Sequence, residues 1–88
     1  MIICFHPNFK KVYSKRFVEN RKLVRKFDER IVVFIKNSTE PILHNYHLTG
    51  NMREFWSFSI TGDIRVIYRK LSEDEAELFD IGSHNQVY

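Results

Sequence analysis

Five residues whose side chains can take part in acid–base chemistry or bind an anion lie near the ends of strands expected in the second half of the chain. They are His47, Asp63, Arg65, His84 and the terminal Tyr88. Histidine changes its charge near neutral pH, so it can serve as a general acid or a general base. Arginine offers a permanent positive charge to a phosphate or carboxylate group.

Two of these residues also fit ordinary structural roles. Asp63 belongs to a Thr-Gly-Asp sequence that is typical of a turn, and Arg65 alternates with apolar neighbours as a solvent-facing strand residue does. Their types alone therefore favour the structural interpretation. His84 fits such a role less well, because it follows Gly82 and Ser83 where the chain leaves a strand.

The sequence excludes most cofactor-dependent enzymes, because it has no glycine-rich phosphate loop, no pair of cysteines for zinc and no serine nucleophile elbow. His44 and His47 have the H-x-x-H spacing of a metal-binding pair. Two imidazoles without a nearby carboxylate or thiol fall short of the three or four ligands that zinc takes. We therefore expect no metal and no cofactor, and we interpret His44 as an exposed loop residue.

Charge is divided unevenly along the chain. Residues 1–36 carry ten Lys and Arg against three Asp and Glu, whereas residues 37–88 carry four basic and eight acidic residues. The formal charge of +3 is therefore the sum of +7 and −4. A surface this basic attracts polyphosphate, which favours nucleic-acid binding over an inert, solvated helix face. The basic residues that would form it are Lys10, Lys11, Lys15, Arg16, Arg21, Lys22, Arg25 and Lys26.

Hydrophobic periodicity predicts the order β-α-α-β-β-β. A short strand at residues 2–5 is followed by a helix that begins at Pro7 and a second helix that is capped by Asn20 and ends before Pro41. Residues 42–49 lose the period and are expected to form a loop. Alternating strands then follow at residues 55–60, 64–69 and 76–81.

This order predicts an α+β architecture. The two N-terminal helices should form an antiparallel hairpin and pack on one face of a mainly antiparallel four-stranded sheet. The 88 residues suffice for one small domain over residues 1–88, with the hydrophobic content, 43%, of a globular core. A single cysteine, Cys4, cannot form an internal disulfide, and no apolar run is long enough for a membrane span. We expect a cytoplasmic protein with no membrane partner.

Three short motifs follow one another in the second half of the chain. They are His47-Leu48-x-Gly50, Gly62-Asp63-Ile64-Arg65-Val66-Ile67-Tyr68-Arg69 and Ile81-Gly82-Ser83-His84-x-x-Val87-Tyr88. Each is weak alone. In this order and spacing, the chain resembles the RelE/YafQ family of toxins from bacterial type II toxin–antitoxin systems, over nearly its whole length.

The resemblance implies an mRNA interferase, a small endoribonuclease that enters the ribosomal A site, cuts mRNA without a metal and is held inactive by a cognate antitoxin. Attack of a ribose 2′-OH on the adjacent phosphate needs a base, an acid and a cation. By similarity, His84 is the general acid and His47 the general base, with Asp63 tuning or orienting an imidazole. Arg65 would stabilise charge on the phosphate, and Tyr88 matches a terminal aromatic that stacks on a base or positions RNA.

One position departs from the family pattern. YafQ-like toxins usually carry another histidine on the strand before the Gly-Asp turn, where this chain has Ser59. A serine there can still hydrogen-bond a phosphate. Acid–base groups contribute about 10²–10⁴-fold each, so the smaller set remains compatible with slow cleavage.

Two other functions fit the same sequence. One is a non-catalytic toxin of the same fold, similar to ParE toxins, which inhibit DNA gyrase by binding. The other is an RNA-binding or structural module without toxicity and without a partner. Fold alone does not choose among them, but a gyrase binder has no need of His47, Arg65 and His84 together, which favours the nuclease.

Overall fold

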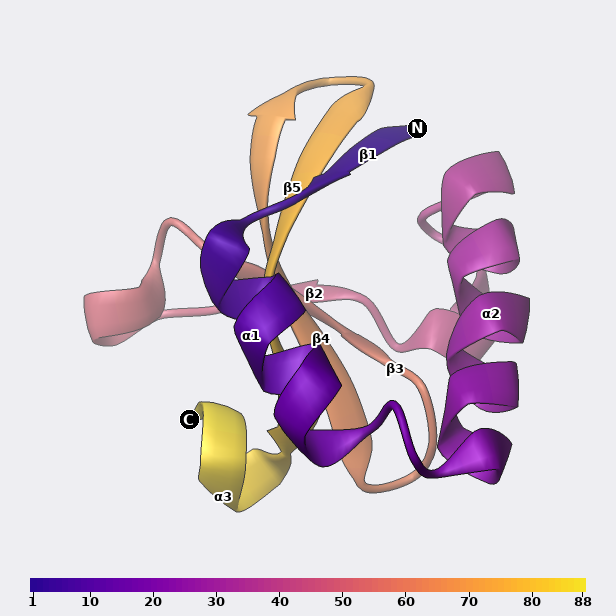
Figure 1. Ribbon diagram of the computed structural model, residues 1–88. Helices are drawn as coiled ribbons and strands as arrows, with labels where there is room; N and C mark the ends of the chain where they lie inside the picture. The colour runs from indigo at the N-terminus through magenta and orange to yellow at the C-terminus, as the bar shows by residue number, and fades with distance from the viewer.

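A five-stranded mixed sheet forms the centre of the molecule, in a computed structural model that describes all residues from 1 to 88 (Figure 1). The strands are β1 (Ile2–Phe5), β2 (Tyr46–His47), β3 (Trp56–Ser59), β4 (Ile64–Ser72) and β5 (Glu75–Ser83). The helices are α1 (Pro7–Arg16), α2 (Arg21–Lys36) and α3 (His84–Val87), and two 3₁₀ turns occur, η1 (Pro41–Leu43) and η2 (Gly50–Met52). The predicted α+β class is confirmed.

The strands lie in the order β1-β5-β4-β3-β2. β1 runs parallel to β5, and the other neighbours are antiparallel. The sheet has one strand more than the four that the sequence predicts, because β2 forms within the expected loop at residues 42–49. A strand of two residues is too short to show a period of two, so the sequence pattern did not reveal it.

Both long helices begin as the sequence predicts. Pro7 occupies the first turn of α1, and the His6 side chain accepts a hydrogen bond from the Asn8 backbone N–H at 3.0 Å. The Asn20 side chain caps α2 by accepting from the Leu23 N–H at 3.2 Å. The two helices run in opposite directions and stand apart in Figure 1, and the Phe27 side chain of α2 bridges them by reaching the rings of α1.

The main core lies between these two helices and one face of the sheet. Phe34 of α2 is completely buried, with its ring centroid 4.4 Å from that of Phe58 on β3 and 4.9 Å from that of Tyr68 on β4. Burial raises the pKa of Tyr68 to about 12. The loss of a buried Phe side chain typically costs about 3–5 kcal/mol, so this aromatic cluster carries a large part of the stability of so small a domain.

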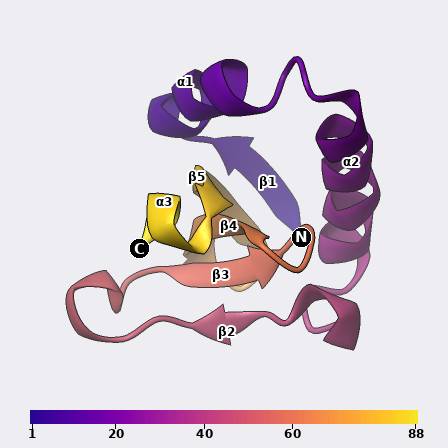
Figure 2. The ribbon, with the colours of Figure 1, turned by 90° about the horizontal axis from the view of Figure 1, so that it is seen from below.

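A second, smaller core lies on the opposite face of the sheet. Leu48, Ile67 and Val87 pack there, with Val87 contributed by α3. Successive strand residues point to opposite faces, so Phe58 and Tyr68 face the long helices while Ser57 and Ile67 face α3. Figure 2 shows α3 set apart from α1 and α2, and its main contacts are with β5 and β4. This second face carries the candidate site.

None of the helices combines the length and the apolar sequence that crossing a membrane would require.

Candidate active site

Four elements deliver polar side chains to the face of the sheet that α3 covers. β2 supplies Tyr46, β3 supplies Ser57, β4 supplies Arg65, and α3 with the residue after it supplies His84 and Tyr88. The register places Tyr46 opposite Ser57 and Ser57 opposite Ile67, so side chains from separate strands meet on one face. The structure thus brings together three of the predicted site residues, Arg65, His84 and Tyr88, which are joined by hydrogen bonds and ring contacts.

The guanidinium of Arg65 is held from three sides. Its Nε donates to Ser57 Oγ at 2.5 Å, and one terminal nitrogen donates to the His44 carbonyl oxygen at 2.8 Å. Its central carbon lies 4.8 Å from the centroid of the Tyr46 ring, within the range of a cation–π contact. These contacts fix the plane of the guanidinium and leave its other N–H groups free to bind an anion.

Hydrogen bonds among two tyrosines and a buried serine tie the end of the chain to the sheet. The Tyr88 hydroxyl donates to Ser57 Oγ at 2.7 Å and lies 3.1 Å from the Tyr46 hydroxyl. Because Tyr88 gives its only hydroxyl hydrogen to Ser57, Tyr46 is the donor between the two phenols. This hydrogen bond, together with burial, raises the pKa of Tyr46, so its phenol keeps its proton and is no base at neutral pH.

His84 stands at the start of α3 and faces Tyr88. The two ring centroids are 4.5 Å apart in an edge-to-face arrangement. The Ser83 backbone N–H donates to Gln86 Oε1 at 2.8 Å, which closes the turn that presents His84. Gly82 precedes this turn, and a Cβ there would lie 2.8 Å from Arg16 Nη1 and Gln86 Oε1, so a larger residue would require the ends of these two side chains to move.

A cavity of about 300 Å³ opens beside this network. Four of its six lining residues are hydrophobic. The phenol rings and the apolar side chains give it the character of a site for a flat ring, and His84 belongs to its wall. Its lining residues are Tyr46, Leu48, Thr49, Met52, His84 and Tyr88.

His47, the predicted general base, lies away from this network. It follows Tyr46 on β2 and therefore points to the other face of the sheet, where its ring stacks on that of Trp56 with centroids 4.6 Å apart. Its Nε2 forms a hydrogen bond with the Arg53 carbonyl oxygen. The structure therefore does not bring His47 together with His84.

Asp63 and Ser59 lie around the turn between β3 and β4. The ion pairs of the structure join Arg16 to Asp80, Lys26 to Glu29 and Arg69 to Glu77, so none of them holds the exposed Asp63. Ser59 lies opposite Arg65 in the ladder, and its hydroxyl donates to the Thr61 carbonyl oxygen at 2.5 Å. Neither side chain contacts the imidazole of His84 or His47 through a hydrogen bond or an ion pair.

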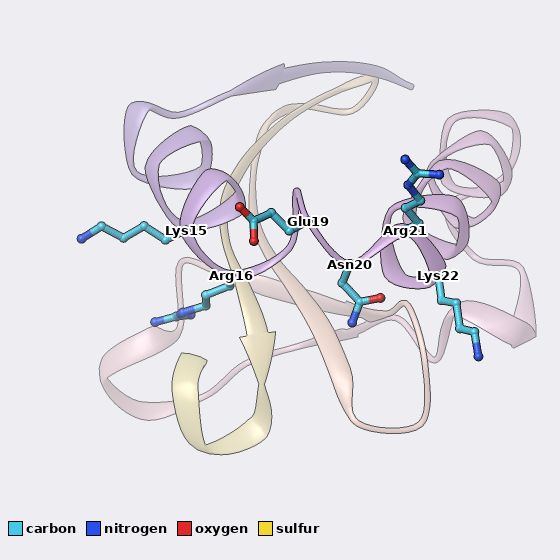
Figure 3. Close-up of a pocket in the computed structure, with 6 residues that line it drawn as sticks. All are labelled: Lys15, Arg16, Glu19, Asn20, Arg21 and Lys22. Carbon is cyan, nitrogen blue, oxygen red and sulfur yellow. The ribbon is translucent and has the colours of Figure 1, made fainter.

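The predicted basic surface spans α1, the turn after it and the start of α2. A wide hollow of about 570 Å³ at the turn is lined only by polar side chains, which spread away from one another in Figure 3. Arg16 is partly engaged in the fold, because it donates to the Ile81 carbonyl oxygen at 3.1 Å and lies 3.8 Å from Asp80. Burial raises the pKa of Asp80, and the Ile81 N–H and Arg16 offset part of this effect. Diverging cations suit a broad polyanion better than a small ligand.

Two members of the site, Tyr46 and Ser57, were not predicted from the sequence. Ser57 carried a usable signal, since in the Trp-Ser-Phe-Ser run it shares a face with Ser59 and so with the arginine of the next strand. Tyr46 carried none, because β2 is too short for a period. No group of three His, Cys, Asp or Glu side chains is arranged to hold a metal ion.

The sequence matches a family model described as "Bacterial toxin of type II toxin-antitoxin system, YafQ" over residues 1–88. The chain therefore belongs to the YafQ family of toxins of bacterial type II toxin–antitoxin systems, and the resemblance seen in the three motifs is confirmed. No protein of curated function matches the chain significantly.

Solved structures share the fold at low sequence identity. A YoeB/ParE toxin from Agrobacterium tumefaciens superposes with a TM-score of 0.76 at 21% identity, over 96% of this chain and 99% of that one. A YoeB-YefM complex from Staphylococcus aureus superposes with a TM-score of 0.74 at 22% identity, over 96% of this chain and 97% of that one. The DinJ-YafQ complex of E. coli superposes with a TM-score of 0.72 at 16% identity, over 98% of this chain and 96% of that one. At these identities the likeness concerns the fold.

Proposed function

We propose that this toxin is an endoribonuclease that cuts mRNA on the ribosome in the cytoplasm and is held inactive by a cognate antitoxin. The observation that carries the proposal is the hydrogen-bonded set of Arg65, Ser57 and Tyr88, with His84 against the Tyr88 ring and a base-sized cavity beside it. The set combines a fixed cation, an imidazole that can act as the acid, and aromatic rings that can hold a nucleobase. Cleavage of RNA without a metal uses the first two together with a general base.

In the proposed reaction, a ribose 2′-oxygen attacks the adjacent phosphorus and the 5′-oxygen of the next nucleotide leaves. The free N–H groups of Arg65 stabilise the charge that builds on the phosphoryl oxygens. His84 gives a proton to the leaving oxygen. Tyr88 and Tyr46 hold a nucleobase of the RNA in the aromatic-lined cavity.

The general base of this reaction is assigned to His47, with a condition set by the sheet. His47 and Tyr46 are neighbours on β2, the edge strand, and point to opposite faces. An RNA that crosses this edge meets both faces of the sheet. His47 can therefore serve as the general base only if the RNA chain bends over β2 and brings the ribose 2′-OH to its imidazole. Ser59 is the last residue of β3 and Asp63 lies on the turn that follows it, and we assign both contacts with the RNA rather than with an imidazole.

An antitoxin partner is supported by the relatives. The family model describes toxins of toxin–antitoxin systems, and two of the structural neighbours are complexes whose names pair a toxin with a second protein, YefM or DinJ. The site is open at the surface, so a partner segment that covers Tyr88 and His84 would block it.

The test is a pair of assays on the purified chain, one for cleavage of mRNA on programmed ribosomes and one for DNA supercoiling by gyrase. The second assay is needed because one structural neighbour is named YoeB/ParE. We expect cut mRNA and unaffected supercoiling. Gyrase inhibition with intact mRNA would establish the ParE-like function instead.

Neutralising the basic surface should weaken ribosome binding without unfolding the chain. The variant replaces Lys10, Lys11 and Lys15, all exposed on α1, by Gln and keeps Arg16, which contacts β5. For each RNA phosphate that the variant no longer binds, the slope of log K against log salt should become shallower by about 0.7–0.9. The measurement is sedimentation with ribosomes at several salt concentrations. The control is Lys36→Gln, the same kind of substitution on α2. An unchanged affinity and slope would mean that this surface is an inert helix face.

A further inference from the structure

A second cavity lies beside Arg65, and only Arg65 and Ser59 among its lining residues have a role assigned above. It has a volume of about 410 Å³ and is lined by Arg30, His44, Ser59, Thr61, Gly62 and Arg65, together with the half-exposed Ile42. It forms where α2, the η1 turn and the β3–β4 turn meet, which lie together in Figure 2. Two guanidiniums and no carboxylate line it, so the cavity is electropositive.

Both arginines of the cavity are held in place by backbone carbonyls. One terminal nitrogen of Arg30 donates to the carbonyl oxygens of Ile42 at 3.1 Å and Ser59 at 3.3 Å. Arg65 uses its Nε and one terminal nitrogen for Ser57 and His44. Each guanidinium has five N–H groups, so both keep donors that these bonds do not use. Cations oriented in advance bind an anion with little further loss of side-chain entropy.

The backbone of His44 is held in an unusual conformation at the wall of this cavity. His44 has a φ of 45° and is the one non-glycine residue with a positive φ. Its carbonyl oxygen accepts the hydrogen bond from Arg65 that fixes the guanidinium. Backbone conformations of this kind persist where the surrounding structure imposes them, and they are frequent at ligand sites.

Arg65 lines this cavity and is linked to the aromatic one through Ser57. Its Nε donates to Ser57 Oγ, which also accepts from Tyr88 in the wall of the aromatic cavity, and one terminal nitrogen donates to the His44 carbonyl oxygen. One cavity is largely apolar and contains two phenols, whereas the other is polar and cationic. A nucleotide strand presents the same alternation of flat bases and charged phosphates on either side of the reacting phosphodiester.

We propose that the cavity between Arg30, His44 and Arg65 binds a backbone phosphate of single-stranded RNA next to the phosphate at which the strand is cut. Arg30 is a positioning residue in this arrangement, since it holds the neighbouring phosphate and so places the scissile one against Arg65 and His84. The identity of the ligand as RNA rests on the proposed endoribonuclease function. Its negative charge is inferred from the two arginines that are held in the cavity.

The experiment measures binding to the isolated ¹⁵N-labelled chain by NMR, so it does not need the ribosome. The probes are inorganic phosphate and a dinucleotide whose 2′-oxygen is methylated, which prevents cleavage. The backbone amides of Thr61 and Gly62 report on the cationic cavity, and that of Thr49 reports on the aromatic one. We expect phosphate to shift Thr61 and Gly62 saturably while leaving Thr49 unmoved, and the dinucleotide to shift all three.

Three variants separate phosphate binding from a structural role. Arg30→Gln should lower the affinity of the chain for both probes about tenfold, as expected for losing a charge-assisted hydrogen bond. Lys36→Gln removes the same charge from α2 outside the cavity and should change either affinity by less than about twofold. Asn at position 44 tolerates a positive φ, so His44→Asn keeps the backbone conformation and the carbonyl that binds Arg65. It removes the imidazole and should lower the affinity for phosphate several-fold without destabilising the fold.

Any of three results would overturn the proposal. The first is no saturable shift at Thr61 and Gly62, and the second is an equal affinity of the wild type and both cavity variants for the probes. The third is a chain that binds inorganic phosphate but does not bind the dinucleotide. Failure of the proposed function has a different signature. A chain that binds the dinucleotide at Thr61 and Gly62, but cuts no mRNA on ribosomes, retains the phosphate site and loses the endoribonuclease assignment.

Discussion

Replacing His84 by Ala is expected to lower the rate of mRNA cleavage by about 10²–10⁴-fold, the usual contribution of a positioned general acid. Without the imidazole, the leaving 5′-oxygen must take its proton from water. His84 is exposed and makes no hydrogen bond through its side chain that the fold depends on, so the variant should remain folded. The measurement is single-turnover cleavage of mRNA on programmed ribosomes, together with growth after induction, where the variant should no longer arrest the cells.

The matched control is Asn85→Ala, which truncates the next exposed side chain of α3. It should cleave at nearly the wild-type rate. Thermal unfolding of both variants shows whether α3 stays docked through Val87, which is buried against Ile67. If folded His84→Ala cuts mRNA as fast as the wild type, His84 is not the acid.

Replacing Arg65 by Lys should lower kcat by about 10²-fold or more, although the charge is kept. Lysine cannot reproduce the geometry in which one guanidinium reaches Ser57, the His44 carbonyl and the Tyr46 ring while keeping N–H groups for phosphate. The buried Ser57 would also lose one of its two donors, which loosens the position of Tyr88. Single-turnover rates over a range of toxin concentrations separate this loss of kcat from a change in ribosome binding.

Arg69→Lys is the control for this substitution, because Arg69 lies on the same strand and pairs with Glu77 away from the site. A lysine there can keep the ion pair, and cleavage should stay within about twofold, as expected for a surface pair. Equal rates for Arg65→Lys and Arg69→Lys would mean that Arg65 contributes only charge and that its fixed orientation is irrelevant to catalysis.

The long elements of the fold were predictable because each has a local cause. Pro7 and Asn20 mark the helix starts, and alternating residues mark β3, β4 and β5. The sequence did not reveal β2 or α3, since two and four residues are too few to establish a period. Both short segments form because tertiary contacts hold them, β2 by pairing with β3 and α3 by burying Val87.

The site was predictable in part for the same reason. The motifs singled out Arg65, His84 and Tyr88, which the fold does bring together. The register of β2 against β3 decides the rest, because it turns Tyr46 toward Arg65 and His47 toward Trp56. A shift of one residue would exchange the two faces, and a two-residue strand without a sequence period gives no indication of its register.

The chemical identity of the RNA ends tests the central claim most directly. The fragments released from ribosome-bound mRNA by the purified wild-type chain should carry a 2′,3′-cyclic phosphate or its opened form upstream and a 5′-hydroxyl downstream, and a 2′-deoxy substitution at the cut site should prevent cleavage. These ends follow from attack by the ribose 2′-oxygen, with His84 protonating the leaving oxygen and Arg65 bound to the phosphate. A downstream fragment with a 5′-phosphate, or cleavage that persists at the 2′-deoxy position, would contradict the account, because water and not the ribose would then be the nucleophile.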